Sequence, residues 1–395
     1  MQRPKKRSAN RRTLLIGIST RALADSAVAG NHRVVALDYF GDRDKPGGAP
    51  GYSLKRDWGL DFSPANLLLA SRKIDYQSVV YTSNLENYPE VVAAFDRNGN
   101  VLGNSPQSLQ AVRSWGILRR FCAENRIRTP RTLLPGEENL AGGDTKWLVK
   151  SEHSGGGHGI RPWQGKSLQE GHILQEAVDG QPASILFVAD GKKSRILGVT
   201  EQLIGRPHFC DAPYRWCGNL VSMDAHDGGP LRRYLETMVS SFVKRFGLRG
   251  VNGIDFMVDR MSAEKPVYFL EVNPRYTAAM ELLEQACNIN IFSLHIAGAD
   301  GVLPTVSPTL HRPKAYSAKG IVFARRNLTI QQTDGWIDRQ RRDIPFPGDR
   351  VAAGAPICSV FAWGDSRKSC LHRLQTAADA VRMDAGDKLE GREPC

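Results

Sequence analysis

The sequence predicts an α/β protein in which a doubly wound parallel domain precedes a larger part built of antiparallel or mixed sheets. Over the first hundred residues, short apolar runs alternate with helical patterns, which is typical of parallel strands joined by helices. From Trp147 onward, apolar runs are bounded by glycines, as in antiparallel or mixed sheets. A chain of 395 residues is also long enough for two or three domains.

The elements of the first part follow one another at short intervals. We predict strands at 13–19, 32–40 and 78–83, and helices at 20–30, 66–73 and 88–96. The glycine- and proline-rich stretch 42–51 indicates a loop. After the first strand, Gly17 is followed by no further glycine at the spacing of a G-x-G-x-x-G dinucleotide site, so a Rossmann dehydrogenase is not favoured.

The second part contains longer elements. We predict helices at 108–125, 231–246, 278–286, 291–297 and 371–383. Strands are expected at 147–150, 172–178, 185–188, 196–202, 251–259, 267–273, 320–324 and 357–362. No internal repeat is found.

Composition excludes several classes of protein. Hydrophobic residues make up 41% and charged residues 24%, which rules out a disordered chain, a collagen-like repeat and a disulfide-dense miniprotein. No apolar stretch approaches the ~20 residues that span a bilayer, so we expect no membrane partner. We find no secretion signal, and the seven cysteines form no C-x-x-C pair. The sequence therefore predicts a cytoplasmic protein with free thiols.

Positive charge is concentrated at the N-terminus. The net charge is +12, and residues 1–12 contain six basic residues and no acid. We expect this stretch to be a disordered, solubilising tail. A nucleic-acid-binding arm is less favoured because no aromatic residue is interleaved with the basic ones.

The first candidate site is a lysine followed by a glycine-rich stretch. Trp-Leu-Val-Lys, ending at Lys150, precedes Ser154, Gly155, Gly156, Gly157, His158 and Gly159. Closely spaced glycines let backbone N–H groups approach an anion, and a lysine at the end of a strand can contact the same phosphates. A flexible hairpin tip is the alternative. We favour phosphate binding because of the lysine, although no Walker sequence is present.

The second candidate site combines three oxygen-bearing side chains on neighbouring strands. Glu271 and Asn273 are two residues apart and share one face of their strand. With a hairpin loop centred on Ala263, Asp255 lies opposite Glu271. The same register puts Gly253 opposite Asn273.

Two carboxylates directly across a ladder are ~5 Å apart and repel each other unless a cation lies between them. The oxygen ligands of Asp255, Glu271 and Asn273 suit Mg²⁺ or Mn²⁺. The alternative is that Asp255 caps a local structure and Glu271 pairs with Arg275. We favour the metal site because three such ligands stand directly before an arginine.

Between these sites lies an apolar strand that ends in polar residues and a turn. Its last positions are Gln175, Glu176, Ala177 and Val178. Backbone groups of such a segment can pair with an adenine edge while an apolar side chain covers the ring. Without the flanking motifs, an edge strand with a turn would be the better interpretation.

Taken in order, the lysine-ended strand with its glycine loop, Gln-Glu-x-Val, Asp255 and Glu-Val-Asn-Pro-Arg at 271–275 resemble the ATP-grasp superfamily. The resemblance runs from about 108 to 297. The segments 16–22, 36–44 and 343–349 further resemble a carboligase-like group related to biotin carboxylase. Members of that group are associated with biosynthesis of the one-carbon carriers methanofuran and tetrahydromethanopterin.

The resemblance implies an ATP-grasp domain of two α+β subdomains and a division of the chain into four parts. These are a tail at 1–12, an α/β domain at 13–107, an ATP-grasp domain at 108–304 with a small subdomain at about 128–180, and a C-terminal segment at 305–395 that packs back on both domains.

The resemblance also implies a set of roles. Lys150 and the loop from Ser154 to His158 would contact the phosphates of ATP, and Gln175, Glu176, Ala177 and Val178 would form the adenine hinge. Asp255, Glu271 and Asn273 would hold one or two magnesium ions. Two residues would act in catalysis: Lys150 would offset charge on the transferred phosphoryl group, and Arg275 would hold an acylphosphate or the tetrahedral oxyanion.

Two positions depart from the pattern of the superfamily. A phosphate-binding lysine on the preceding helix is missing, because that stretch contains Arg113 and no lysine. A ribose-binding glutamate past the hinge is replaced by Gln181 and Pro182. Whether Arg113 replaces the lysine is left open.

The expected function is an ATP-dependent ligase for a small-molecule carboxylate and an amine, with glutamate and tyramine as one plausible pair. The alternatives are a biotin-carboxylase-like carboxylase and a nucleotide-binding protein without catalysis. No biotin-bearing Met-Lys-Met segment is found. The sequence does not specify the oligomeric state, and a homodimer is one option.

Overall fold

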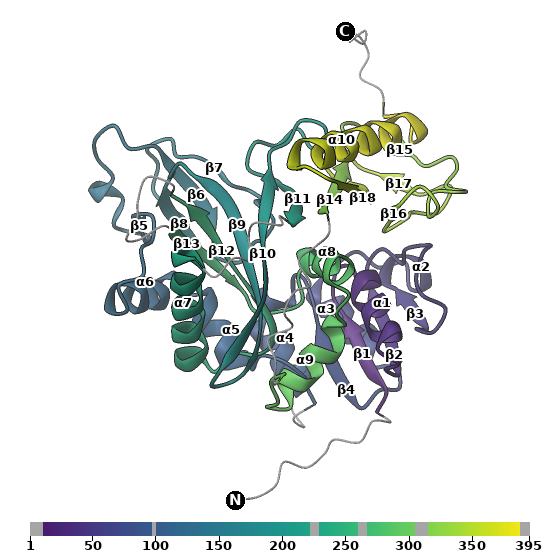
Figure 1. Ribbon diagram of the computed structural model, residues 1–395, viewed down its shortest axis with the longest axis horizontal. Coiled ribbons are helices and arrows are strands. Elements are labelled where there is room, and N and C mark those ends of the chain that lie inside the picture. Colours follow the sequence, from purple (N-terminus) through teal and green to yellow (C-terminus); the bar gives the residue numbers. More distant parts are fainter. Residues whose placement is uncertain (1–10, 97–99, 222–228, 260–266, 305–314, 388–395) are drawn as a thin grey trace, which may run out of the picture.

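The computed structural model describes residues 11–387 apart from 97–99, 222–228, 260–266 and 305–314 (Figure 1). Most of the predicted basic tail, the loop centred on Ala263 and the last residues therefore lie outside the described residues. Among the helices of the described ranges, none is long and apolar enough to cross a membrane.

The N-terminal part is a parallel sheet with helices, as predicted. Strands β1, β2, β3 and β4 lie in the order β3-β2-β1-β4, and all of their pairings are parallel. The strands span Thr13–Ile16, Val34–Asp38, Gly51–Ser53 and Ser78–Tyr81. The helices are α1 (Arg21–Ala29), α2 (Leu54–Asp57), α3 (Pro64–Ser71), η1 (Leu85–Asn87) and α4 (Pro89–Asp96). Strands β1, β2 and β4 are buried along their whole length, which explains their continuous apolar sequences.

The largest sheet has eight antiparallel strands in the order β13-β12-β9-β10-β11-β14-β18-β16. The strands of its first half are β9 (Gln181–Asp190), β10 (Ser194–Ile204), β12 (Arg249–Val258) and β13 (Val267–Asn273). Those of its second half are β11 (Trp216–Val221), β14 (Tyr316–Phe323), β16 (Arg341–Arg342) and β18 (Pro356–Gly364). Segments from before and after residue 305 thus share one sheet.

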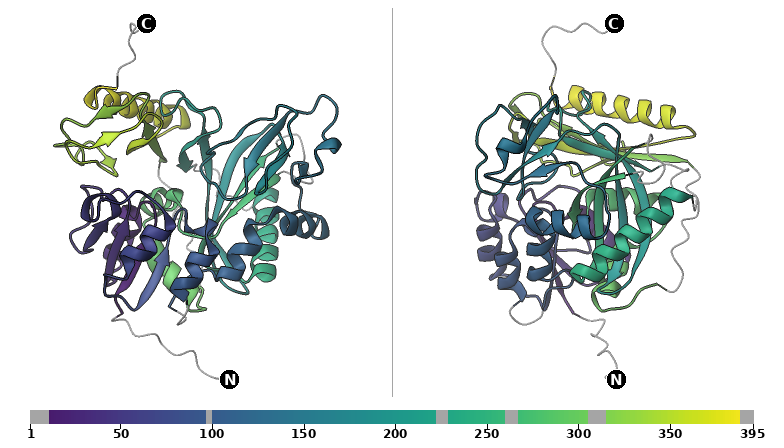
Figure 2. Two further views of the ribbon diagram at one scale, coloured as in Figure 1. Left: turned by 180° about the vertical axis from the view of Figure 1, so that it is seen from behind. Right: turned by 90° about the vertical axis from the view of Figure 1, so that its left-hand side faces the viewer.

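A separate antiparallel sheet carries the glycine-rich stretch. Its order is β5-β8-β6-β7, with strands at Thr132–Leu133, His172–Glu176, Trp147–Ser151 and Arg161–Pro162. A short 3-10 helix, η2 (Glu138–Leu140), precedes β6, and a two-stranded sheet pairs β15 (Leu328–Thr329) with β17 (Arg350–Val351). Figure 2 shows the N-terminal domain below the C-terminal strands, with the glycine-bearing sheet on the other side of the molecule.

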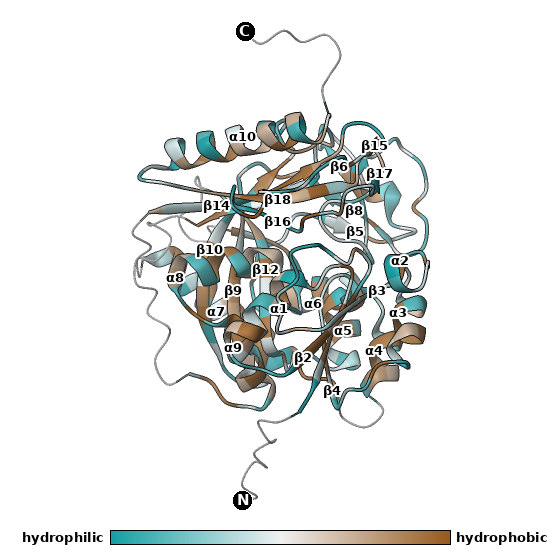
Figure 3. Cartoon of the chain, turned by 90° about the vertical axis from the view of Figure 1, so that its right-hand side faces the viewer, coloured by the Kyte–Doolittle hydropathy of each residue, from teal (hydrophilic) through white to brown (hydrophobic). Residues whose placement is uncertain are grey.

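Helices cover both faces of the large sheet. One face is covered by α5 (Pro106–Arg113), α6 (Trp115–Glu124) and α7 (Pro230–Phe246), whose aromatic residues share a core with β12 and β13. The other is covered by α8 (Ala278–Cys287) and α9 (Ile291–Ala299), which also contact α1, and α10 (Arg367–Asp384) packs on β14 and β18. Figure 3 shows hydrophobic colour on buried strands such as β2 and β9.

Several short elements were not predicted, and three of the longer elements differ from the sequence-based expectation. The helix predicted at 108–125 is two helices, because the backbone of Ser114 is extended and the Trp115 N–H donates to Glu152 Oε1 at 2.7 Å instead of continuing the helix. Strand β11 was not predicted. Its Gly218 has a φ of +155°, and an added Cβ would lie 2.1 Å from the Lys319 carbonyl oxygen, so a glycine that suggests a turn instead allows close strand pairing.

Strand β14 is the third difference. It begins at Tyr316 rather than at Gly320, because the polar Lys319 is buried within the strand and its ammonium is paired with Glu281 on α8 at 2.5 Å. The remaining long elements form where predicted, within a few residues at their ends.

Candidate active site

A large cavity lies between the N-terminal parallel sheet, the sheet that carries the glycine-rich stretch, and the eight-stranded sheet. Its volume is about 1440 Å³, compared with roughly 300–1,000 Å³ for the site of one small ligand. Its walls come from loops that follow β1, β2 and β4, from the glycine-rich stretch, from β12 and β13, and from the segment 349–359. The cavity therefore has room for a nucleotide and for further substrates.

The predicted register of the two acidic strands is confirmed. In the β12–β13 ladder, Asp255 lies opposite Glu271 and Gly253 lies opposite Asn273. All of these residues except Gly253 line the cavity. The side chains that the sequence predicted to face one another therefore lie on neighbouring strands and border one space.

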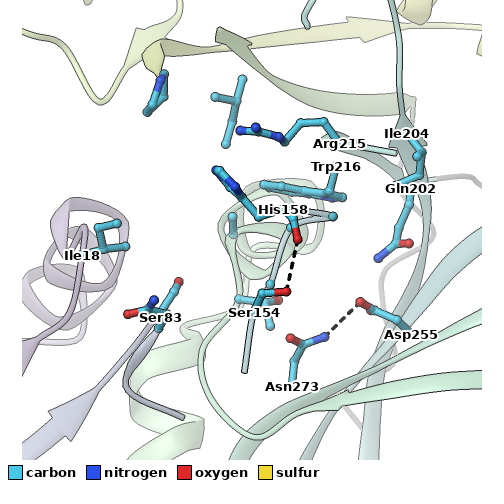
Figure 4. A pocket seen from close by; sticks show the side chains of 18 of the residues that line it. Ile18, Ser83, Ser154, His158, Gln202, Ile204, Arg215, Trp216, Asp255 and Asn273 are labelled. Atoms are coloured by element: carbon cyan, nitrogen blue, oxygen red, sulfur yellow. Dashed lines mark hydrogen bonds between the residues drawn. The ribbon is translucent and has the colours of Figure 1, made fainter. Parts of the chain in front are cut away.

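Asp255 is a buried carboxylate that accepts hydrogen bonds from two neighbouring side chains. Its Oδ1 accepts from the Ser184 hydroxyl at 2.5 Å, and its Oδ2 accepts from Asn273 Nδ2 at 3.0 Å (Figure 4). Burial, followed by the charge of Glu271, raises the pKa of Asp255 to about 7. Gln202 Nε2 donates to the same Ser184 hydroxyl at 2.7 Å. The sequence analysis missed Ser184 and Gln202, which come from other strands.

Glu271 pairs with Arg113, whereas the alternative interpretation of the sequence paired it with Arg275. Its Oε2 lies 3.5 Å from an Arg113 nitrogen, whereas the Arg275 Nε donates to Glu86 Oε1 at 2.6 Å. Another Arg275 nitrogen donates to Asn273 Oδ1 at 3.3 Å. Arg275 therefore stays beside the acidic strands and is anchored from the loop that follows β4.

Arg113 ties together the two candidate sites. Its second terminal nitrogen donates to the carbonyl oxygens of Glu152 and Ser154, each at 2.8 Å, at the base of the glycine-rich stretch. Its guanidinium also meets Glu271, and its Nε has no hydrogen-bond partner among the described residues. The helix that lacks the usual lysine thus supplies a cation at the edge of the cavity.

Lys150 points at the predicted adenine segment. Its Nζ donates to Gln175 Oε1 at 2.6 Å, and Gln175 Nε2 in turn donates to the Thr132 hydroxyl at 3.0 Å. Burial lowers the pKa of Lys150, and the charge of Glu271 opposes this shift. The Gln175 side chain is therefore part of a buried polar chain, which favours a structural role for that side chain.

Two residues of the predicted adenine hinge already use their backbone N–H groups in hydrogen bonds to neighbouring segments of the protein. The N–H groups of Glu176 and Ala177 donate to the carbonyl oxygens of Arg131 and Lys146. The N–H of Val178 donates to no residue that the structure describes, and it lies at the cavity wall. Among the N–H groups of residues 176–178, that of Val178 is therefore the one without a protein acceptor among the described residues.

The glycine-rich stretch packs against a segment that the sequence did not associate with it. The Trp216 N–H donates to the Gly156 carbonyl oxygen at 3.0 Å. Gly157 has a φ of +73°, and an added Cβ would lie 1.9 Å from the Tyr214 carbonyl oxygen. The Ser154 hydroxyl donates to the His158 carbonyl oxygen at 3.3 Å, which closes the loop on itself. Figure 4 shows His158 and Trp216 together on one side of the cavity, across from Ile18 and Ser83.

We predict that Gly157→Ala opens this contact. A side chain in left-handed backbone costs roughly 1–3 kcal/mol, and here it also meets the Tyr214 carbonyl oxygen. Hydrogen exchange of the Trp216 amide should therefore accelerate by about tenfold or more, since each 1.4 kcal/mol is a factor of ten.

Gly155→Ala is the matched control for this prediction. An added Cβ at Gly155 meets open space, and the residue does not need a positive φ. Equal exchange rates in the two variants would contradict the proposed packing of the loop.

Comparisons with known proteins agree with this arrangement. Residues 118–279 match the ATP-grasp domain family. A comparison with curated proteins finds no match. Among solved structures, the biotin carboxylase domain of Hydrogenobacter thermophilus 2-oxoglutarate carboxylase is similar with a TM-score of 0.69 and 13% identity, covering 93% of this chain and 89% of that one.

Two further solved structures are similar over nearly the whole chain. Biotin carboxylase from Campylobacter jejuni has a TM-score of 0.69 at 14% identity, covering 93% of this chain and 91% of that one. An L-amino acid ligase from Bacillus licheniformis has a TM-score of 0.68 at 14% identity, covering 94% and 98%. Residues 118–279 therefore match an ATP-grasp domain, and the chain shares its fold with these biotin carboxylases and this ligase.

Proposed function

We propose that the protein is an ATP-dependent carboxylate–amine ligase that acts through an acylphosphate. The observation that carries this proposal is that a glycine loop, Lys150, the facing carboxylates of Asp255 and Glu271, and Arg275 all line one cavity. The volume of that cavity exceeds the requirement of a single nucleotide. The similar solved structures include a ligase with the same fold.

In this proposal, ATP lies between the glycine-bearing sheet and the large sheet. Lys150 and the loop from Ser154 to His158 contact its phosphates, and the Val178 amide contacts the adenine. Arg113 contributes the second cation that the missing lysine would otherwise supply. Asp179 lines the cavity directly after the hinge and offers a carboxylate to the ribose hydroxyls.

Magnesium fits the acidic strands of the site. Two carboxylates face each other there with a raised pKa at Asp255, so a divalent cation would relieve their repulsion. Among the described residues, no three His, Cys, Asp or Glu side chains gather into a metal site. In this proposal the Asn273 side chain would be the third ligand. Asp255, Glu271 and Asn273 would hold Mg²⁺ or Mn²⁺, which when bound neutralises charge on the transferred phosphoryl group.

The reaction then has two steps. A carboxylate oxygen of the first substrate attacks the γ-phosphorus of ATP, and the bond to the leaving ADP oxygen breaks. The amine nitrogen attacks the acyl carbon, inorganic phosphate leaves, and the nitrogen loses one proton to solvent or phosphate. Lys150 stabilises charge in the first step, and Arg275 stabilises the acylphosphate and the oxyanion of the second.

At the finer level, we propose glutamate as the carboxylate and a small amine such as tyramine, as in biosynthesis of a methanofuran-type cofactor. This pair rests on the resemblance of the segments 16–22, 36–44 and 343–349. A homodimer is one possible assembly, since the similar Hydrogenobacter thermophilus domain is described as a dimer.

A biotin-carboxylase-like reaction is the second candidate, because two of the similar structures are biotin carboxylases. In that case bicarbonate would take the place of the carboxylate substrate, and a separate carrier would provide biotin. A nucleotide-binding protein without catalysis is a third alternative. The presence of Asp255, Glu271, Asn273 and Arg275 around one cavity argues against it.

We expect release of phosphate and ADP from ATP to require magnesium together with a carboxylate and an amine. The measurement is phosphate release with pooled amino acids and amines, followed by mass spectrometry of the products. Release that bicarbonate alone stimulates would favour the carboxylase. ATP binding without turnover across the whole panel would favour the non-catalytic protein.

A further inference from the structure

Buried hydrogen-bond acceptors without partners lie directly beside Arg275. Glu86 is 2% exposed, and only its Oε1 is used, by the Arg275 Nε. Its Oε2 and the Asn84 Oδ1 have no hydrogen-bond partner within the part of the chain that the structure describes. Both residues line the cavity. A buried carboxylate oxygen and a buried amide oxygen that no protein donor reaches are costly, unless a ligand supplies the donors.

The position of these acceptors in the fold is typical of a ligand site. In the order β3-β2-β1-β4, the chain proceeds from β1 to one side of the sheet and later returns to β4 on the other side. The loops after β1 and β4 therefore separate at the carboxyl edge of the sheet, where open α/β sheets bind their ligands. Asn84 and Glu86 stand in the loop after β4, and Ile18 in the loop after β1.

We propose that Glu86 and Asn84 bind the ammonium group of a primary amine substrate that has an apolar body and no carboxylate beside its nitrogen. This inference rests on the proposed ligase function and assigns its second substrate. It is carried by the unpartnered acceptors and by their position next to Arg275.

In the second step of the proposed reaction, the amine nitrogen has to lie next to the acyl carbon of the acylphosphate. An ammonium group has three N–H donors and no acceptor, so it matches a site that offers oxygens alone. Arg275 would hold the acylphosphate, and Glu86 is the residue that anchors Arg275. A nitrogen bound at Glu86 therefore lies next to the acyl carbon. After the ammonium loses one proton to solvent, the nitrogen lone pair forms the C–N bond while the C–O bond to phosphate breaks, and the nitrogen then loses its second proton to solvent or to the released phosphate.

The cavity wall beside these acceptors is apolar. The Ile18 N–H donates to the Ser83 carbonyl oxygen at 2.5 Å, and the Tyr39 N–H donates to the Ile18 carbonyl oxygen at 3.2 Å. These contacts place Ile18 beside Ser83, the residue before Asn84, and Tyr39 beside Ile18, and the side chain of Ile18 lies near Ser83 in Figure 4. Ile18, Tyr39 and Phe40 all line the cavity. They offer a surface to hydrocarbon or aromatic carbon atoms.

Further along the same sheet edge, the lining is acidic. Asp42 is 8% exposed, lines the cavity, and its Oδ2 has no partner among the described residues. Asp38, Asp44 and Asp343 surround it. The cations Arg21, Lys45 and Lys319 in this region are already paired with Asp343, Asp38 and Glu281. Among the described residues beside Asp42, each of these cations already has an acidic partner, so a carboxylate on the amine substrate would find no free cation here, which distinguishes a simple amine from an amino acid.

The first test separates binding of the amine from formation of the acylphosphate. Glu86→Gln keeps an oxygen for the Arg275 Nε but removes the negative charge and one acceptor. With glutamate and ATP, hydroxylamine is a small, neutral nucleophile that traps an acylphosphate without needing an ammonium site. We expect this variant to lose at least tenfold less hydroxamate formation than amine transfer, relative to the parent protein. Its kcat/KM for the amine should fall by roughly 10- to 100-fold, mainly through KM.

The amine in this test is the best substrate among butylamine, 2-phenylethylamine and tyramine. Glu90→Gln is the matched control, because Glu90 is an exposed glutamate on α4, and it should leave both activities unchanged. If Glu86 merely positions Arg275, hydroxamate formation will fall together with amine transfer, and the inference is wrong. An unchanged KM for the amine would also overturn it.

The second test compares matched nucleophiles with the parent protein. We expect 2-phenylethylamine and tyramine to be transferred with at least tenfold higher kcat/KM than phenylalanine and tyrosine. Equal or reversed preference contradicts the inference, as does hydroxamate formation without transfer to any amine of the panel. Failure to form hydroxamate with any carboxylate would instead overturn the proposed ligase function itself, and the inference with it.

Discussion

Glu271→Gln should abolish turnover while the protein stays folded. A metal acting as a Lewis acid contributes several kcal/mol to a transition state, and each 1.36 kcal/mol is a factor of ten. Losing one of the two carboxylate ligands should therefore lower kcat by on the order of 10³-fold. The fold should persist because the substitution removes a negative charge that faces Asp255 across the ladder. Repulsion between the two strands decreases in the protein without metal.

This result is measured as magnesium-dependent phosphate release, with circular dichroism and thermal unfolding to check the fold. Glu124→Gln is the control, since Glu124 is an exposed glutamate at the end of α6. Magnesium titration gives a second readout: the variant should need a higher concentration for any remaining activity. Near-normal turnover at the same magnesium concentration would remove Glu271 from the metal site.

The sequence predicted contacts within one hairpin well and contacts between distant segments poorly. The pairing of Asp255 with Glu271 was predicted from a hairpin centred on Ala263 and the period of two along a strand. The ladder has this pairing, although its register shifts between Asp255 and Phe256. The partners of these residues come from elsewhere. Arg113, which meets Glu271, lies 158 positions earlier in the chain, and Glu86 lies 189 positions before Arg275. No local pattern specifies such pairs.

The glycine-rich stretch shows the same difference between local signals, which the sequence contains, and contacts with distant segments, which it does not specify. Closely spaced glycines indicated that the backbone needs to approach something, and an anion was the natural candidate. The structure adds a second reason, because Gly157 also contacts the carbonyl of Tyr214 and no side chain would fit. One signal, the carboxyl edge of a parallel strand, could have found Glu86. The loop after β4 contains a glutamate where α/β proteins bind ligands.

A buried network of charges joins the N-terminal domain to the rest of the chain. Arg21 on α1 is completely buried, and its guanidinium contacts Glu281 on α8 and Asp343 after β16. It also lies 3.6 Å from Asp44 and 2.9 Å from Asp25. Lys319 approaches Glu281 from β14. Arg21 is thus surrounded by carboxylates from three parts of the fold.

We expect Arg21→Met to destabilise the protein by about 3–5 kcal/mol, the usual cost of removing one partner from a buried ion pair. The side chains are similar in length, so the loss comes from carboxylates that remain buried without their cation. Arg21 and Lys319 lower the pKa of Asp343 to about 2. The stability that this carboxylate contributes is therefore complete above its unfolded pKa of ~3.9 and is lost as the pH falls toward 2.

The measurement is the free energy of unfolding in urea near neutral pH, with Arg72→Met as the control because Arg72 is exposed on the end of α3. Adding Glu281→Gln to Arg21→Met should restore part of the loss, since it removes one of the uncompensated charges. If the double variant is less stable than Arg21→Met alone, the cost arises from packing around α1 and α8 rather than from unpaired charge. A change below about 1 kcal/mol in Arg21→Met would show that water or neighbouring protons compensate the carboxylates, and that the three parts are held together mainly by their apolar contacts.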